Sequence, residues 1–140
     1  MSAHFQRGPE SKTGLEALAL IAQGFAVFPI WWMRDGRCAC GKPECKSPAK
    51  HPIPRNGVKE ATIDSAVVLD WWGRYPLANI GIATGSASRL WVLDVDAHSA
   101  DKNGEASLLA LEARYGPLPE TLTVKTGKGR HLYFRIEQER

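Results

Sequence analysis

The chain has 140 residues, of which 44% are hydrophobic and 24% are charged, and its formal net charge at pH 7 is +3. This length and composition support one ordinary hydrophobic core, so we expect one globular domain, or most of one. The small charge is compatible with a nucleic-acid partner but does not require one. No apolar run is long enough to span a bilayer and the N-terminus lacks the apolar segment of a secretory signal, so we expect a cytoplasmic protein with no membrane partner.

The N-terminal part of the chain predicts a leader, a helix and a strand. Residues 1–12 are polar and predict a disordered leader. From Thr13 onward, apolar residues recur at helical spacing as far as Gly24, where we expect a C-terminal cap. The apolar residues 25–30 then predict a strand.

A cluster of cysteines and a histidine is the next feature along the chain. Cys38, Cys40, Cys45 and His51 lie within fourteen residues. An odd number of cysteines at such close spacing argues against disulfides. Three thiolates and one imidazole can close a tetrahedral structural site, so we expect a Zn²⁺-binding knuckle within residues 34–57. The alternative is a loop with incidental cysteines.

Basic residues are dense around this cluster. They are Arg34, Arg37, Lys42, Lys46, Lys50, Arg55 and Lys59. Such a group is either a solvated loop face or a contact for a DNA backbone or a triphosphate. Lys50 is the best single candidate for that contact because it lies next to the expected zinc ligand His51.

A second helix is predicted to begin after Asp64, a good N-cap residue, and to end before Pro76. Trp71 and Trp72 lie on its apolar stripe. Adjacent tryptophans can serve as stacking platforms for bases, but their place on the stripe favours the core. We therefore predict that both are core residues.

Two strands are predicted next, over residues 79–83 and 89–95, and the second leads into Asp94 and Asp96. Alternation along a strand puts both carboxylates on one face, about 7 Å apart at Cα. Carboxylates at that separation can share divalent cations roughly 4 Å apart, which clamp the oxygens of a phosphoryl transfer. The alternatives are aspartates that only begin a loop, and the Asp-x-Asp motifs of phosphatases and glycosyltransferases. His98 is predicted to belong to the loop that leaves the strand.

The last predicted elements are a helix over residues 104–115 and a hairpin of strands 121–125 and 131–136. Strands and helices in alternation favour an α/β sandwich layered on a mainly antiparallel sheet. The hairpin turn contains glycines and leads to His131. Such a turn can offer backbone N–H groups, and the histidine an imidazole, to phosphates. A histidine that opens a strand is otherwise a packing residue.

Together these motifs resemble the N-terminal prim-pol domain of bifunctional DNA primase/polymerases, relatives of the archaeal and eukaryotic primase catalytic subunits. The resemblance covers nearly everything from Gly14 onward and is carried by residues 78–85, 93–96, 116–121 and 126–134. The relatives also have a Cys/His cluster that ends in Lys-His-Pro. The implied fold is α+β, with an RNA-recognition-motif-like sheet of mainly antiparallel strands, packed helices and a zinc-binding loop insertion.

The resemblance implies a DNA primase or polymerase that joins nucleoside triphosphates on a single-stranded DNA template. Asp94 and Asp96 would bind the catalytic Mg²⁺ or Mn²⁺, and His131 would contact the triphosphate of the incoming nucleotide. The nucleotide-binding residues would be Lys50, Thr126, Gly127, Gly129, Arg130 and His131. The resemblance leaves open whether RNA or DNA is made and whether a helicase domain follows in the full-length gene.

Two features depart from the family pattern. Relatives often have two glycines or a serine before the histidine, whereas Lys128, Gly129 and Arg130 are expected to fill the turn here. The family's third metal-binding carboxylate lies on a later strand, and the sequence stops at Arg140. Glu137 would lie roughly 20 Å from His131 along a regular strand and, like Glu139, is no substitute.

We therefore expect the prim-pol domain of residues 13–140 to be C-terminally incomplete and inactive by itself in primer extension. One alternative is a non-catalytic fragment that binds nucleotide or DNA. Another is a zinc-knuckle DNA-binding protein in which Asp94 and Asp96 only cap loops.

Overall fold

The computed structural model of the protein describes residues 11–137. The chain divides into two compact units, with the division between Ala83 and Thr84. Residues 1–10 of the predicted leader lie outside the described residues. The last two residues of the predicted leader are not disordered but begin the first helix, with Ser11 as its N-cap and Lys12 as its first helical residue. Within the described part of the chain, no helix has the length and hydrophobicity needed to cross a membrane.

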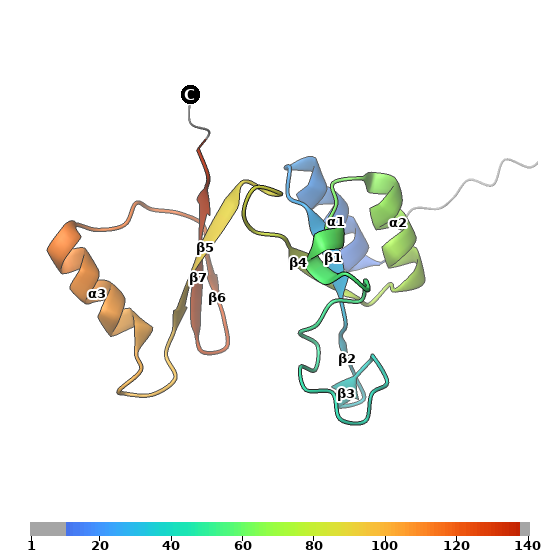
Figure 1. Ribbon diagram of the computed structural model, residues 1–140, viewed down its shortest axis with the longest axis horizontal. Coiled ribbons are helices and arrows are strands. Elements are labelled where there is room, and N and C mark those ends of the chain that lie inside the picture. Colours follow the sequence, from blue (N-terminus) through green and yellow to red (C-terminus); the bar gives the residue numbers. More distant parts are fainter. Residues whose placement is uncertain (1–10, 138–140) are drawn as a thin grey trace, which may run out of the picture. The chain divides into compact units, whose positions relative to one another are not determined.

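The first unit combines helices with two small antiparallel pairs of strands (Figure 1). Its elements are α1 (Lys12–Ala22), β1 (Val27–Ile30), β2 (Met33–Arg34), β3 (Arg37–Cys38), the 3-10 helix η1 (Gly57–Glu60), α2 (Ser65–Arg74) and β4 (Asn79–Ile82). β1 pairs with β4, and β2 pairs with β3. Both α1 and α2 contact β1.

The end of α1 confirms the predicted glycine cap. Gly24 has a φ of +91°, a left-handed conformation that glycine adopts without steric cost. Its N–H donates to the carbonyl of Ile21, and the N–H of Phe25 donates to the carbonyl of Leu20. This pair of hydrogen bonds is a Schellman motif, which satisfies the last carbonyls of the helix and turns the chain into β1.

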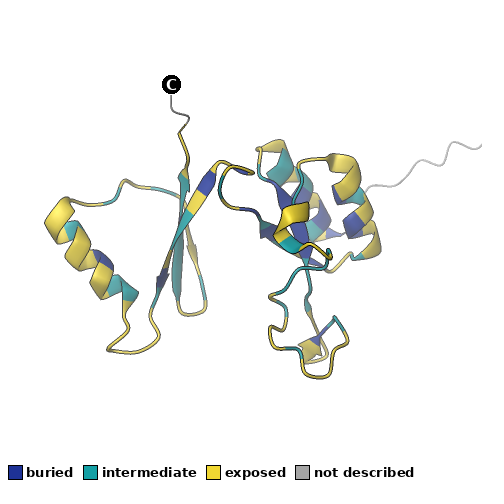
Figure 2. Ribbon diagram, in the orientation of Figure 1, coloured by how far each residue is buried: buried dark blue, intermediate teal, exposed yellow. Residues whose placement is uncertain are grey.

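The core of the first unit is built around Trp72, which is fully buried together with Val27 and Val68. The indole N–H of Trp72 donates to the carbonyl of Ala78 at 3.2 Å, so its one polar group is satisfied. Trp71 is also buried. The prediction that both tryptophans of α2 are core residues is confirmed, and Figure 2 shows the buried inner side of this helix.

The second unit is a three-stranded antiparallel sheet with one helix. Its elements are β5 (Leu90–Asp96), α3 (Gly104–Tyr115), β6 (Thr123–Lys125) and β7 (Gly129–Arg135), and the strand order is β5-β7-β6. Val95 of β5, Leu108 of α3 and Leu132 of β7 form its buried core. α3 therefore covers one face of this sheet.

Alternation along the strands gives the sheet two different faces. Val95 and Leu132 point toward α3, so Asp94, Asp96 and His131 point the other way. In the β5–β7 register, Asp94 lies directly opposite His131. Sequence periodicity and strand pairing thus bring these three side chains to one face.

The predicted hairpin of β6 and β7 is confirmed, but its turn is shorter than predicted. β7 begins at Gly129, so Gly129 and Arg130 are strand residues and not turn residues. The N–H of Thr126 donates to the carbonyl of Gly129 at 2.9 Å, which leaves only Gly127 and Lys128 between them. The pairing of Gly129 with Asp96 and of Arg130 with Val95 extends the strand to this point.

The fold class is mixed α and β with small antiparallel sheets, in agreement with the coarse prediction. The described strands form the pair β1–β4, the pair β2–β3 and the sheet β5-β7-β6.

Candidate functional site

The Cys/His cluster in the first unit begins at the β2–β3 hairpin. The turn of this hairpin is Asp35-Gly36, and both residues have positive φ, 48° and 74°. Two such residues are characteristic of the tight turn that joins antiparallel strands. The hairpin delivers Cys38 at the end of β3, where it is buried. His51 lies beside the end of β1, where its backbone carbonyl accepts a hydrogen bond of 3.1 Å from the N–H of Trp31.

The four predicted zinc ligands converge. One ligand atom from each of Cys38, Cys40, Cys45 and His51 lies within 4.8 Å of all the others. His51 Nε2 is 3.5 Å from Cys38 Sγ and 3.4 Å from Cys45 Sγ. Tetrahedral zinc with bonds of about 2.3 Å to sulfur and 2.0 Å to nitrogen requires a sulfur–nitrogen separation of about 3.5 Å. The residues therefore fit a zinc ion, and no other such group of three or more occurs within residues 11–137.

The protonation of the thiols is uneven. Burial raises the pKa of Cys38, but hydrogen bonds, the strongest from the backbone N–H of Ala49, outweigh it and lower the pKa to about 6. The backbone N–H of Ser47 lowers the pKa of Cys45, but burial and the neighbouring thiols outweigh it and raise the pKa. Cys38 is thus mainly thiolate at neutral pH, the form that binds metal. Cys45 must lose its proton when metal binds.

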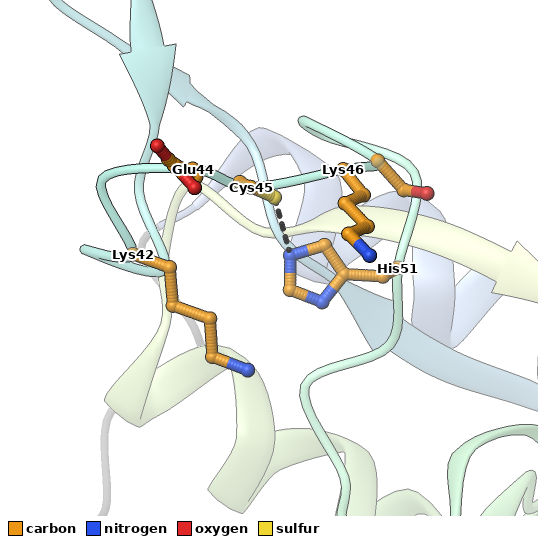
Figure 3. Close-up of a pocket in the computed structure, with 6 residues that line it drawn as sticks. Lys42, Glu44, Cys45, Lys46 and His51 are labelled. Atoms are coloured by element: carbon orange, nitrogen blue, oxygen red, sulfur yellow. Dashed lines mark hydrogen bonds between the residues drawn. The ribbon is translucent and has the colours of Figure 1, made fainter.

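A pocket of about 360 Å³ opens beside the cluster, as Figure 3 shows. Its lining residues are Lys42, Glu44, Cys45, Lys46, Ser47 and His51. The charges of Lys42 and Lys46 are partly offset by Glu44, so the pocket is not a strongly cationic site. Lys50, the predicted phosphate contact, is exposed and does not line this pocket.

The second candidate site is the open face of the sheet in the second unit. His131 Nε2 lies 3.3 Å from Asp94 Oδ1. The Asp94 side chain is 56% exposed and that of Asp96 40% exposed, so both carboxylates are accessible. Accessible oxygen donors on one face match the preference of Mg²⁺ and Mn²⁺ for oxygen ligands. Asp94 and His131 are thus in contact, and Asp96 lies on the same face two residues further along β5.

His98 is closer to this site than the sequence suggested. Its Nε2 lies 3.3 Å from Asp96 Oδ2, although the residue belongs to the loop after β5 as predicted. The loop is folded back by the N–H of His98, which donates to the carbonyl of Lys102 at 3.0 Å. Each of the two aspartates therefore has one histidine partner.

Arg130 lies on the opposite face of β7 from His131. Its Nε donates to Glu105 Oε1 at 2.7 Å and its Nη2 to Glu105 Oε2 at 3.0 Å. This pairing lowers the pKa of Glu105 and raises that of Arg130. The predicted nucleotide-binding residues are thus not all brought together. Thr126 and Gly127 lie at the hairpin end, and Arg130 is turned toward α3.

Sequence reasoning did not single out Glu105 or Gly104. The available signal was local: Asn103 is a good N-cap residue, and its side chain accepts from the N–H of Glu105 at 3.0 Å. That signal places an acid in the first turn of α3 but does not name its partner on β7.

Comparison with known families identifies the chain. The family model described as "Bifunctional DNA primase/polymerase, N-terminal" matches residues 17–139, which is most of the 140-residue sequence. The matched range includes the Cys/His cluster, the acidic pair and His131. Comparison with the curated proteins and with the solved structures gives no significant match. The chain belongs to the family of N-terminal prim-pol domains of bifunctional DNA primase/polymerases.

Proposed function

We propose that this domain carries out template-directed nucleotidyl transfer from nucleoside triphosphates, as a DNA primase, a DNA polymerase or both, with its reaction centre on the open face of β5 and β7. The observation that carries the proposal is that Asp94, Asp96 and His131 share that face, with Asp94 directly opposite His131 and in contact with it. Family membership supports the same chemistry at a coarse level.

Asp94 and Asp96 are the residues that would hold the divalent ions. Their carboxylates are accessible and lie two residues apart on one strand. Bound Mg²⁺ or Mn²⁺ would polarise the attacking 3′-hydroxyl and offset charge on the phosphoryl oxygens. His98 and His131 would then shift from their aspartate partners as those carboxylate oxygens are engaged.

His131 would serve as a hydrogen-bond donor to the triphosphate. It shares the face and the register position of Asp94, so a phosphate held at that carboxylate lies within reach of its imidazole. Thr126 and Gly127 would shape the hairpin end, and the N–H of Gly129 would face the phosphates. Arg130, also predicted from the sequence to bind phosphate, has its side chain on the other face of the sheet, paired with Glu105. Lys50, in the first unit, would contact DNA or triphosphate from the zinc loop.

The Cys/His cluster would hold one structural zinc ion. Four protein ligands leave no open position for substrate or water, which is the pattern of a structural site. The further parts of the proposal are a single-stranded DNA template, an RNA-recognition-motif-like sheet of mainly antiparallel strands, a prim-pol domain over residues 13–140, and a helicase domain as a partner in the full-length gene.

A second candidate function is nucleotide binding without catalysis. It is favoured by one observation: among residues 11–137, neither Asp94 nor Asp96 belongs to a group of three or more converging His, Cys, Asp or Glu side chains. Two carboxylates can hold one ion, while a second ion and the attacking hydroxyl need another anionic ligand.

Calorimetric titration of dATP with and without Mn²⁺ tests metal-dependent nucleotide binding, which both candidate functions require. In the wild type, Mn²⁺ should tighten dATP binding, because each ligand screens the charge of the other. In D94N/D96N this coupling should disappear, whereas the control D101N, on the loop after β5, should retain it. Equal coupling in wild type and D94N/D96N would remove the metal assignment.

Primer extension separates the two functions. The full-length gene product should incorporate nucleotides with Mn²⁺ present and lose this activity in D94N/D96N. Metal-dependent dATP binding without any incorporation would favour the binding module.

A further inference from the structure

The backbone of Asp96 is enclosed by two glycines from different elements. A Cβ atom added to Gly104, the first residue of α3, would lie 2.7 Å from the carbonyl oxygen and 3.0 Å from the nitrogen of Asp96. A Cβ atom added to Gly129, the first residue of β7, would lie 1.8 Å from the carbonyl oxygen of Val95 and 3.1 Å from Asp96 Cα. Only residues without a side chain fit at these two positions. Asp96 is therefore held between α3 and β7 by direct backbone contact.

The two glycines are each followed by one member of an ion pair. Glu105 follows Gly104, Arg130 follows Gly129, and the two side chains form a bidentate pair at 2.7 and 3.0 Å. Bidentate arginine–carboxylate pairs fix orientation as well as distance. The pair thus connects the two segments that enclose Asp96.

We propose that Glu105 and Arg130 are positioning residues that hold the Asp96 carboxylate in place for metal binding, an inference that rests on the proposed function of the acidic face. The carboxylate of Asp96 is 40% exposed, so few contacts of its own side chain restrain it. Its backbone is restrained through Gly104 and Gly129, and the ion pair keeps those two segments together.

This geometry assigns Arg130 a role other than direct contact with the triphosphate. His131 and Arg130 are successive residues of β7, so their side chains leave opposite faces of the sheet. Two of the three guanidinium nitrogens, Nε and Nη2, already engage Glu105. A triphosphate on the Asp94 face would require Arg130 to leave this partner and cross the sheet.

A double-mutant cycle tests the proposal. The variants are R130Q, E105Q, the double variant, and R130K, which keeps the charge but not the planar fork. R114Q is the matched control, because Arg114 is an exposed arginine of α3 whose guanidinium lies over the Tyr115 ring. Mn²⁺ affinity is measured by electron paramagnetic resonance, and dATP affinity is measured without metal.

If the pair positions Asp96, R130Q and E105Q should each weaken Mn²⁺ binding about tenfold, a size typical of groups that orient a metal ligand. The double variant should be no weaker than either single variant, R130K should recover part of the affinity, and R114Q should match the wild type. Metal-free dATP affinity should stay unchanged throughout. A loss of metal-free dATP affinity in R130Q but not in E105Q would overturn the proposal and make Arg130 a phosphate ligand.

A second measurement separates this inference from the proposed function. The N–H of Ala97 donates to the carbonyl of Lys128 at 2.8 Å, next to the enclosed Asp96 backbone. Its hydrogen exchange should be faster in R130Q and E105Q than in the wild type and R114Q. If wild type and D94N/D96N bind Mn²⁺ equally, the proposed function fails, and the Ala97 exchange rate alone decides whether the pair holds Asp96. Unchanged exchange in both single variants would refute positioning.

Discussion

At the scale of single residues, the pairing of His131 with Asp94 combines two roles in one contact. The imidazole lies 3.3 Å from a carboxylate that would bind metal, and it is itself only partly buried. In the proposed function, metal bound at this carboxylate would free the imidazole to donate to phosphates on the same open face. The same side chain would thus have a partner in both the metal-free and the nucleotide-bound states.

His131→Ala should weaken triphosphate binding by about tenfold to a hundredfold, because a hydrogen bond to a charged group is worth roughly 1.5–3 kcal/mol. Binding of the nucleoside, which lacks phosphates, should change little and serves as the internal control. Titration of both ligands into both proteins measures the effect. If a folded variant binds triphosphate as the wild type does, His131 is a packing residue.

At the scale of elements, the close contact between β5 and β7 depends on residue 129 being glycine, which has no side chain. A methyl group at Gly129 would overlap the Val95 carbonyl, whereas a methyl group at Gly127 would meet no heavy atom within 4 Å. Neither residue has a φ in the left-handed region, so steric space is what distinguishes them.

Gly129→Ala should therefore force β7 away from β5 and destabilise the protein by roughly 1–3 kcal/mol, the usual range for overpacking. Gly127→Ala, two residues earlier in the same hairpin, should unfold at the same denaturant concentration as the wild type. Urea unfolding of the two variants provides the comparison. Equal stability of both would mean that the β5–β7 contact is looser than described.

The elements could be predicted from the sequence because their signals are local. The cap at Gly24, the apolar stripe with Trp71 and Trp72, and the hairpin of β6 and β7 each follow from neighbouring residues. The start of β7 was predicted too late, since glycines usually mark turns. Only the pairing of Gly129 with Asp96, a contact distant in sequence, makes this glycine a strand residue.

The candidate sites show the same contrast between residues close together in the sequence, which could be predicted, and contacts distant in the sequence, which could not. The Cys/His cluster could be predicted because all its ligands lie within one short segment. The face shared by Asp94 and Asp96 follows from strand alternation. The pair of Glu105 and Arg130, 25 residues apart, and the approach of His98 to Asp96 depend on how α3 and the loop after β5 fold back. Sequence periodicity does not specify such packing.

At the scale of the whole molecule, one zinc ion per chain is expected, since residues 11–137 contain a single converging Cys/His group. Elemental analysis of the purified, reduced protein should give this ratio. His51→Ala should lower it well below one, because three ligands bind zinc much less tightly than four.

His98→Ala is the matched control for this measurement, as it removes a histidine from the second unit and should leave the zinc content unchanged. A folded wild-type protein with almost no zinc under reducing conditions would contradict the assignment.

The short span of the Cys/His cluster also affects the order in which parts of the chain can fold during synthesis. Its ligands lie within residues 38–51, so closing the loop costs little chain entropy. β1, by contrast, must wait for its partner β4, which ends at Ile82. If the cluster binds zinc as proposed, a nascent chain would capture the ion before α2 and α3 have left the ribosome. The proposed zinc ion would then fix His51, whose carbonyl accepts a hydrogen bond from the N–H of Trp31, and would order the end of β1 before β4 has been made.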